Sequence, residues 1–455
     1  MTEERISRGS PLPLHTTPEA PPLTARAGVG DGDLRHTVLR DPDAPPHRVR
    51  QALACLTVDE LHQHGLSLFD AAFLTLFGHV WSRARIREVA AEAVRTWLWN
   101  MWEWHAAIRR LRHEADAGGA TGFDPMLVGW DAAELRRQLG RARGVILAGF
   151  HYGPFRMALV DLVALGFDVV AGVDAHYWRD ASEEIAGIPA LARLGLVNVE
   201  SRSGYRELRA ALDRGAIVCL CFDGNTGVGG RAAAGRADEV LDFLGCAIRA
   251  KTGAARLAAA TGAPLIFAAT RRDASGVGRI ELGPTMRAPQ GSSGEATRAF
   301  AREAIRTLWA ESAVRIEAEP WLWEGARMLH RWRIVANTPR AAPIIHDPAA
   351  RVCAVLDAGR SIRVNERWVA EGMVSENPVW IDVRSMISFV FPKWARGLEA
   401  ALRSTGGVDR CWLAANIPGD HMPIALLADL LGRDLLDIDS GGTPIPDWDF
   451  ASVAP

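Results

Sequence analysis

The amino-acid sequence predicts an α/β protein built around a mostly parallel sheet flanked by helices. Four short apolar runs, rich in β-branched residues, recur through the middle of the chain, and segments with helical spacing separate them. The runs are Gly144 to Phe150, Phe167 to Val173, Ala216 to Phe222 and Ala263 to Thr270. Strands of a parallel sheet have this continuous apolar character because crossover helices cover both faces of the sheet.

The segments between these runs carry the boundary residues of helices. Asp131 is a good N-cap for a helix that ends near Gly140, and Gly215 and Gly262 are good terminators of two others. The four helices expected around the strands are 131–140, 156–165, 205–214 and 251–261. We assign residues 121–336 to this core domain.

The part of the chain before the core divides into a tail and a helical segment. Residues 1–48 are rich in proline and polar side chains, so we expect a disordered tail that cannot bury enough apolar area to offset its ordering entropy. Residues 49–120 have helical periodicity. Ser67 to Trp81 predicts a buried helix, and Ala84 to Asp116, which lacks Gly and Pro, predicts a long one.

Four tryptophans, Trp97, Trp99, Trp102 and Trp104, are concentrated in the long helix. Their spacing distributes them over more than one helix face. Three interpretations remain open: packing against the core, a lining for an acyl chain, or contact with a membrane interface beside the nearby arginines.

Residues 337–455 predict a small C-terminal α/β unit whose role the sequence does not indicate. We expect strands near Val352 to Leu356, Trp380 to Val383 and Cys411 to Ala415, with helices between and after them.

Composition excludes several classes of protein. The 455 residues have a formal net charge of −2, which gives no general basic field for nucleic acid. The six cysteines are scattered without metal-ligand spacing, so we expect no metal and a reducing compartment. We find no secretory signal pattern and no run of about 18 apolar residues. The expected location is the cytoplasm, either soluble or peripheral at the inner membrane face.

Three polar residues stand directly after apolar runs: His151, Asp174 and Asp223. Open parallel sheets bind ligands beyond the carboxyl ends of their strands, so these three are candidate catalytic residues. Neutral imidazole suits acyl transfer, because it can take a proton from an attacking hydroxyl or amine and return it to the leaving thiol. The alternative is that each residue only caps its strand in a satisfied polar network.

Four segments, in order, resemble the bacterial lipid A lauroyl/myristoyl acyltransferase family. They are WDAAELRRQLGRARGVILAGFHYGPFR, LRAALDRGAIVCLCFDGNTG, FLGCAIRAKTGAARLAAATGAPLIFAATRR and EPWLWEGARMLHRWR. The resemblance covers roughly Val128 to Arg333. It implies an α/β acyltransferase fold with no permanently bound cofactor, which uses a thioester of acyl carrier protein or coenzyme A as co-substrate.

The resemblance also implies a histidine–carboxylate pair at the reactive centre. His151 matches the histidine and Gly153 the glycine of the motif, but Arg156 stands where the family has an acid. Three alternatives remain open. Either Asp174 or Asp223 orients His151 instead, or the acceptor is so nucleophilic that a weaker base is sufficient, or the protein is catalytically degenerate.

Five residues are candidates for substrate binding. Arg156 either binds an anion through its planar fork or points away from the site. Arg202 resembles a family arginine that contacts the donor, Asn225 belongs to the turn after Asp223, and His176 lies two residues past Asp174. Gly153 completes the set. The glycine-rich stretch 224–239 predicts a loop over the site.

The leading hypothesis is a soluble acyltransferase, of the kind found in specialised metabolism, with His151 as general base. Its partners would be an acyl donor carrier and a small-molecule or lipid acceptor, with peripheral membrane contact. One alternative is a binding or scaffold protein that retains the fold without catalysis. A second is an aminoacyl-tRNA-dependent transferase, the one case in which we expect a nucleic-acid partner.

Overall fold

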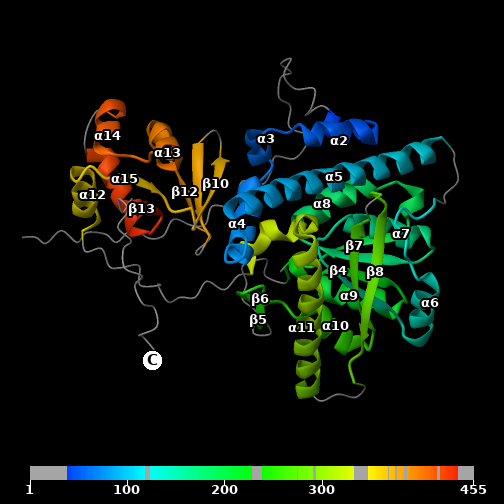
Figure 1. Ribbon diagram of the computed structural model, residues 1–455. Coiled ribbons are helices and arrows are strands. Elements are labelled where there is room, and N and C mark those ends of the chain that lie inside the picture. The colour runs from blue at the N-terminus through cyan, green and yellow to red at the C-terminus, as the bar shows by residue number, and fades with distance from the viewer. Residues whose placement is uncertain are drawn as a thin grey trace, which may run out of the picture.

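The computed structural model describes residues 38–117, 123–224, 226–227, 238–273, 275–289, 294–332, 347–366, 368–374, 377–383, 387–417 and 421–438 (Figure 1). Most of the expected proline-rich tail, residues 1–37, lies outside the described residues. Residues 38–48 belong to the folded part, because Ala44 is buried and helix α2 (Pro46–Ala54) begins within them.

A six-stranded sheet forms the centre of the protein, in the order β3-β2-β4-β1-β7-β8. Its strands are β1 (Val145–Gly149), β2 (Val169–Val173), β3 (Leu194–Asn198), β4 (Ile217–Cys221), β7 (Leu265–Arg272) and β8 (Gly278–Met286). The first five run parallel, and β8 pairs antiparallel with β7. The predicted α/β class and all four predicted strands are confirmed; β3 and β8 are additional edge strands.

Helices cover both faces of this sheet. Helices α9 (Gly204–Asp213), α10 (Gly253–Thr261) and α11 (Gly294–Ala318) bury one face, while α6 (Ala132–Arg141) and α7 (Phe155–Ala164) bury the other (Figure 1). Alternation along β1 divides its residues between two cores: Ile146 faces the first and Leu147 the second. The four predicted helices are confirmed to within two residues at each boundary.

Two of these helices begin or end at the capping residue predicted from the sequence. Asp131 accepts a hydrogen bond from the backbone N–H of Glu134 and caps α6. Gly262 terminates α10 with a φ of 70°, a left-handed conformation that favours glycine.

Before the core, α3 (Val58–Gln63) and α4 (Leu66–Phe77) lead into α5 (Arg83–Asp116), which has 34 residues. Helix α4 is the expected buried helix. Helix α5 contacts the turn that follows β1, where the Asn100 side-chain amide donates to the backbone carbonyl of Gly153 over 3.0 Å.

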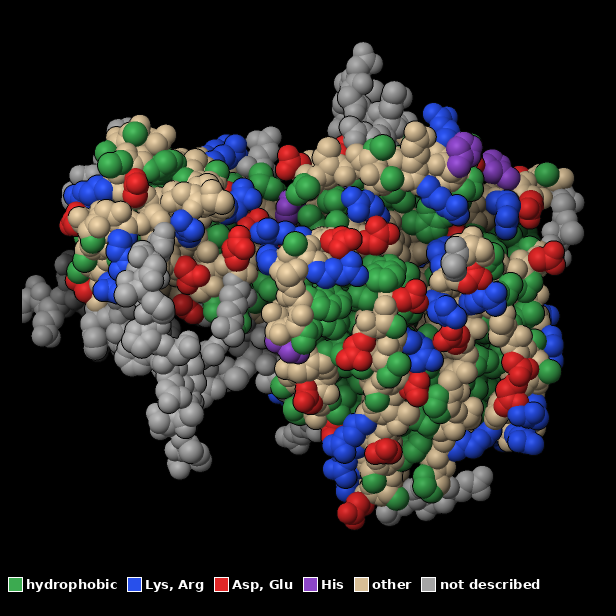
Figure 2. All heavy atoms as spheres, in the orientation of Figure 1, with side chains coloured by type: hydrophobic (Ala, Val, Ile, Leu, Met, Phe, Trp, Pro, Cys, Tyr) green, Lys and Arg blue, Asp and Glu red, His purple; other side chains and the backbone are tan. Residues whose placement is uncertain are grey.

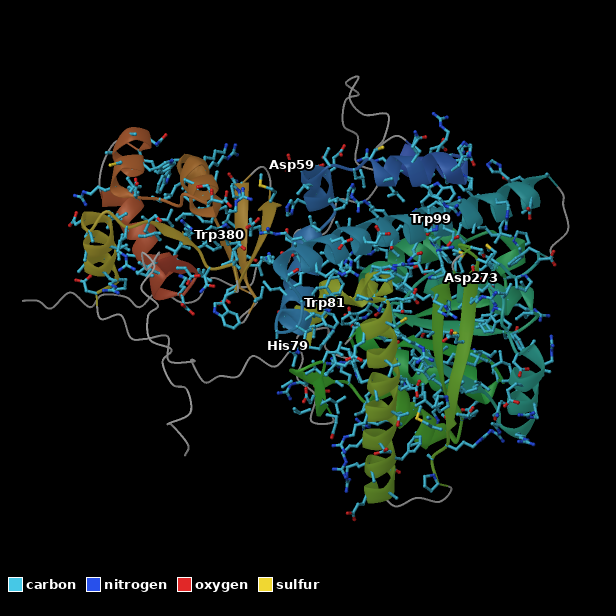
Figure 3. The ribbon with its side chains drawn as sticks, in the orientation of Figure 1. Asp59, His79, Trp81, Trp99, Asp273 and Trp380 are labelled. Carbon is cyan, nitrogen blue, oxygen red and sulfur yellow. The ribbon has the colours of Figure 1, made fainter. Side chains whose placement is uncertain are left out.

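The tryptophans of α5 pack inside the protein. Trp102 and Trp104 are buried, and their indole N–H groups donate to a backbone carbonyl of the N-terminal segment and to a glutamate of α8 (Ala175–Ile185). Trp97 and Trp99 are half-buried, and arginine guanidinium groups lie over their rings; Trp99 is labelled in Figure 3. These contacts support the packing interpretation among the three that the sequence left open.

The C-terminal unit has its own core. It contains helices α12 (Pro348–Asp357), α13 (Arg396–Arg403), α14 (Arg410–Asn416) and α15 (His421–Gly432), a sheet of β10 (Val369–Val374), β11 (Asn377–Asp382) and β12 (Ile387–Val390), and the pair β9 (Ile362–Val364) with β13 (Leu436–Ile438). Strand β11 confirms the strand predicted near Trp380.

The other two predicted C-terminal strands are wrong. Residues 352–356 lie in α12 and residues 411–415 lie in α14. Asp347 and Asp409 accept hydrogen bonds from backbone N–H groups three residues further on, over 2.9 and 2.7 Å. These N-caps, together with helical spacing of the buried residues in α12, outweigh the strand preference of the short apolar runs.

The C-terminal unit packs against α4. The Thr75 hydroxyl donates to the Val383 carbonyl over 3.1 Å, and Arg83 donates to the Val369 carbonyl over 3.2 Å while it pairs with the buried carboxylate of Asp70. No helix within the described ranges is both long and apolar enough to cross a bilayer. On the face drawn in Figure 2, basic and acidic side chains are interspersed.

Candidate active site

His151 and Asp223 meet at the carboxyl end of two adjacent strands. Strands β1 and β4 are neighbours, and their register pairs Gly149 with Cys221. His151 and Asp223 each follow two residues later, so the chain brings them to equivalent positions. The imidazole Nδ1 lies 2.7 Å from Asp223 Oδ1. The Asp223 side chain is buried, whereas the His151 side chain remains 20% exposed.

Besides the imidazole Nδ1–H, two further N–H groups hold the carboxylate of Asp223. The backbone N–H of His151 lies 3.1 Å from both carboxylate oxygens, and the Trp323 indole N–H donates to Oδ2 over 3.0 Å. An acceptor fixed in this way orients the imidazole with its proton on Nδ1. The Nε2 lone pair of the neutral ring is then available as a base.

Gly153 has a structural role in the turn that follows His151. Its φ is +57°, and a Cβ at this position would fall inside van der Waals contact with the Thr270 carbonyl oxygen. Its backbone N–H donates to the Leu322 carbonyl over 2.8 Å. Glycine is therefore required for the tight turn that follows His151.

The segment Trp323-Glu324-Gly325 completes the site, although none of these residues was predicted as a site residue. They stand where two short 3-10 turns meet, Pro320–Leu322 and Glu324–Arg331. A Cβ on Gly325 would clash with Asp223, and the Gly325 N–H donates to the His151 carbonyl over 3.3 Å. The signal available in the sequence was the dense WLWEG segment.

Arg156 forms a buried ion pair with Glu324. Its two terminal nitrogens donate to the two carboxylate oxygens over 2.8 and 2.9 Å. Burial alone would raise the pKa of Glu324, but attraction and hydrogen bonds from Arg156 outweigh it and lower that pKa to about 2. Burial opposes the charge of Arg156 too, yet Glu324 raises the pKa of the guanidinium.

This pairing corrects both expectations for Arg156. The side chain does not point away from the site, and Glu324 already occupies the planar fork that was predicted to bind a substrate anion. Two carboxylates from distant parts of the chain lie at this site. Asp223 orients His151, and Glu324 neutralises Arg156.

Phe155 separates the imidazole from the guanidinium. Its ring lies edge-on to His151, with ring centroids 4.8 Å apart, and the Arg156 guanidinium carbon lies 4.4 Å from its centroid. On another side of the imidazole, a Cβ on Gly224 would lie 3.4 Å from His151 Cε1. The imidazole of His151 is therefore bounded by the ring of Phe155 and by Gly224, which has no side chain.

Cys221 lies beside the His151–Asp223 pair. A metal ion needs several donor atoms close together. Among the described residues, one group meets this condition: a donor atom from each of His151, Cys221 and Asp223 lies within 4.8 Å of the others. Burial and the negative charge of Asp223 raise the pKa of the Cys221 thiol well above its usual value. A protonated thiol and a carboxylate already bonded to three N–H groups favour a hydrogen-bonded pair at this position over a metal centre.

Asp174 occupies a different position from the one expected. It follows β2, which β4 separates from β1, so about 10 Å of sheet lies between the two strands. Its Oδ1 accepts from the Tyr177 backbone N–H over 2.8 Å and caps α8. The prediction that Asp174 or Asp223 orients His151 is thus resolved by strand order in favour of Asp223.

The remaining candidates lie on other elements than His151. His176 is exposed on α8, with a carboxylate one turn further on 3.7 Å from its Nε2. Arg202 is exposed immediately before α9. Asn225 lies outside the described residues, as does most of the predicted loop 224–239.

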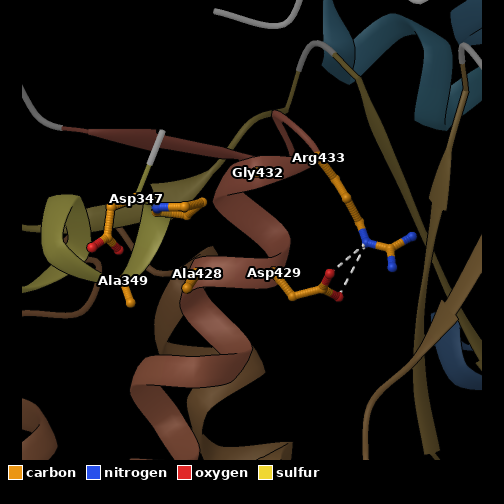
Figure 4. Close-up of a pocket in the computed structure, with 7 residues that line it drawn as sticks. Asp347, Ala349, Ala428, Asp429, Gly432 and Arg433 are labelled. Carbon is orange, nitrogen blue, oxygen red and sulfur yellow. Dashed lines mark hydrogen bonds and ion pairs between the residues drawn. The ribbon is translucent and has the colours of Figure 1, made fainter. Parts of the chain in front are cut away.

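Two surface hollows lie away from this site. One, of about 430 Å³, lies between α12 and α15 in the C-terminal unit, where Arg433 pairs with Asp429 (Figure 4). The other, of about 490 Å³, is apolar and lies among α8, the turn Pro189–Leu191 and β3.

Comparison of the chain with protein-family models gives no match, and comparison with curated proteins gives none either.

Proposed function

We propose that this protein is an acyltransferase in which His151 is the general base and Asp223 its orienting carboxylate. The observation that carries the proposal is the 2.7 Å contact between His151 Nδ1 and a buried carboxylate, at the carboxyl edge of a parallel sheet, with the imidazole still partly exposed. The resemblance to the lipid A acyltransferase family supports the same chemistry, and Asp223 supplies the acid that position 156 lacks.

The transfer uses the two nitrogens of His151 in different ways. Nδ1–H stays bonded to Asp223 while Nε2 removes a proton from the hydroxyl or amine of the acceptor. The acceptor oxygen or nitrogen forms a bond to the thioester carbonyl carbon, and the carbon–sulfur bond breaks. The leaving thiolate takes the proton from Nε2, which releases a thiol and an ester or amide. Asp223 stabilises the transient imidazolium.

The donor class follows from this chemistry. A thioester of coenzyme A or of acyl carrier protein needs no metal and no bound cofactor, since the thiolate is a good leaving group. The acceptor is a small molecule or lipid with a hydroxyl or amine. The proposed location is the cytoplasm.

The test uses purified full-length protein with S-acyl-pantetheine thioesters, which carry the arm common to both donor types, and hydroxylamine as a small acceptor. Thiol release and hydroxamate formation are measured together. We expect His151→Ala to reduce both to the uncatalysed rate. Asp223→Asn should reduce turnover by about 10³-fold or more, because it loses the group that fixes the imidazole tautomer.

The matched control is His47→Ala, which removes an exposed histidine of α2 and should leave turnover unchanged. Circular dichroism checks that each variant is folded. If folded His151→Ala releases thiol as fast as the unmodified protein, the acyltransferase proposal is refuted and a binding role on the same fold becomes the better explanation.

A further inference from the structure

Aromatic rings fill the interior next to the His151–Asp223 pair. Phe150 and Phe222 directly precede the two residues in the chain, and Trp323 bonds to Asp223. All three belong to one continuous cluster of buried rings, whose neighbouring centroids lie 4.7 to 6.4 Å apart. The cluster comprises Phe150, Phe222, Phe243, Phe267, Trp309 and Trp323.

These separations leave no room for a hydrocarbon chain between the rings. A methylene chain contacts a ring at about 3.5 to 4 Å on each side, so two rings that enclose it stand about 7 to 8 Å apart. The observed rings are in direct contact with one another. A long acyl chain could enter this region only by displacing several buried aromatic side chains.

An aromatic ring and a buried ion pair lie on another side of the imidazole. Phe155 lies against His151, and the buried Arg156–Glu324 pair lies directly behind Phe155. Methylene groups can offer no hydrogen bonds to such a pair, so this region does not suit an alkyl tail. A short or polar group suits it better.

The apolar hollow on the surface does not provide a tail site for this centre. Its lining includes Leu194 and Leu196 of β3, the edge strand of the sheet. Strand β3 is three strand spacings from β1, which corresponds to about 14 Å measured across the sheet. Strands β2 and β4 lie between the hollow and His151.

From this packing we infer that the transferred acyl group is short, of about two to four carbons, and is not a long-chain fatty acyl group. The inference rests on the proposed function and narrows it. It departs from the donor that the family resemblance would imply, because the interior that a fatty chain would need is occupied by the aromatic cluster and the ion pair.

The experiment compares acetyl-, butyryl-, octanoyl- and lauroyl-pantetheine as donors to the full-length protein, with hydroxylamine as acceptor. We expect kcat/KM for acetyl or butyryl to exceed that for lauroyl by about tenfold or more, since the described residues packed beside the imidazole leave no space for extra methylenes. A value of kcat/KM that stays level or rises toward lauroyl refutes the inference while the proposed function stands. If no donor reacts faster than with His151→Ala, the proposed function fails and the inference with it.

A variant that opens space provides a second measurement. Phe155 is only partly buried, so Phe155→Ala should fold and create room beside the imidazole. We expect the octanoyl-to-acetyl ratio of kcat/KM to rise by about fivefold or more. Phe389→Ala, at a half-buried phenylalanine of the C-terminal unit, is the matched control and should leave the ratio unchanged. An unchanged ratio in folded Phe155→Ala, or in Phe155→Leu if the alanine variant does not fold, contradicts the inference.

Discussion

Replacing Arg156 with methionine should destabilise the protein because it leaves the buried carboxylate of Glu324 without its cation. Both side chains are about nine-tenths buried, and two hydrogen bonds of 2.8 and 2.9 Å join them. Methionine fills most of the volume of the arginine stem. The decrease in the free energy of unfolding therefore measures mainly the electrostatic and hydrogen-bond contribution of the Arg156–Glu324 pair.

The pKa of Glu324 sets the magnitude. The pair lowers that pKa from 4.5 to about 2. At about 1.4 kcal/mol for each pKa unit, the ionised form gains roughly 3 kcal/mol from folding. Loss of one partner of a buried ion pair typically costs about 3 to 5 kcal/mol, so we expect Arg156→Met to lower the free energy of unfolding by about 3 kcal/mol at pH 7.

The pH dependence of this loss has a definite sign. A carboxyl whose pKa is depressed by folding stabilises the protein above its unfolded pKa of 4.5, and the contribution disappears as pH falls toward 2. The free-energy difference between the unmodified protein and Arg156→Met should therefore shrink by about 2 kcal/mol between pH 7 and pH 3. Urea unfolding followed by tryptophan fluorescence measures it.

A double variant provides the control. Arg156→Met combined with Glu324→Leu leaves no buried charge, so it should recover most of the lost stability. If Arg156→Met unfolds at the same urea concentration as the unmodified protein at pH 7 and only its KM changes, Arg156 binds substrate instead of Glu324. That result would refute the structural role assigned to the pair.

Two further predictions concern the turn after His151 and the contact with the C-terminal unit. Gly153→Ala should cost about 2 kcal/mol or more, because the residue has φ +57° and no space for a Cβ; thermal unfolding measures the loss, and a Tm equal to that of the unmodified protein would contradict the required turn. Arg83→Met should raise the rate of amide hydrogen exchange in β10 relative to β1, because it removes the donor to the Val369 carbonyl and the partner of buried Asp70. Equal exchange in both proteins at β10 would show that this contact does not stabilise the unit.

Local sequence signals were sufficient for four strands and four helices of the core, but not for the edge strands β3 and β8. The apolar runs that became β1, β2, β4 and β7 are continuous because both faces of each strand are buried, and Asp131 and Gly262 act within a few residues of their own positions. The same local reasoning failed in the C-terminal unit. There, short apolar runs were interpreted as strands although capping aspartates at 347 and 409 precede them at helical spacing.

Long-range pairing decided the composition of the site. The sequence predicted His151 as a candidate residue, because a polar residue after an apolar run is a local pattern. It left Asp174 and Asp223 as equal candidates for its partner, since both follow strands. Only the strand order, which places β4 next to β1 and β2 beyond it, selects Asp223.

The sequence by itself determined the fold class and four strands and four helices of the core, and it singled out His151 as a candidate residue. The tertiary structure alone decided which carboxylate orients that histidine and what role Arg156 has. Glu324 follows Arg156 by 168 residues, and no local pattern relates the two. Periodicity and capping act over a few residues, whereas the contacts of a buried charge depend on which distant segments the folded sheet brings together.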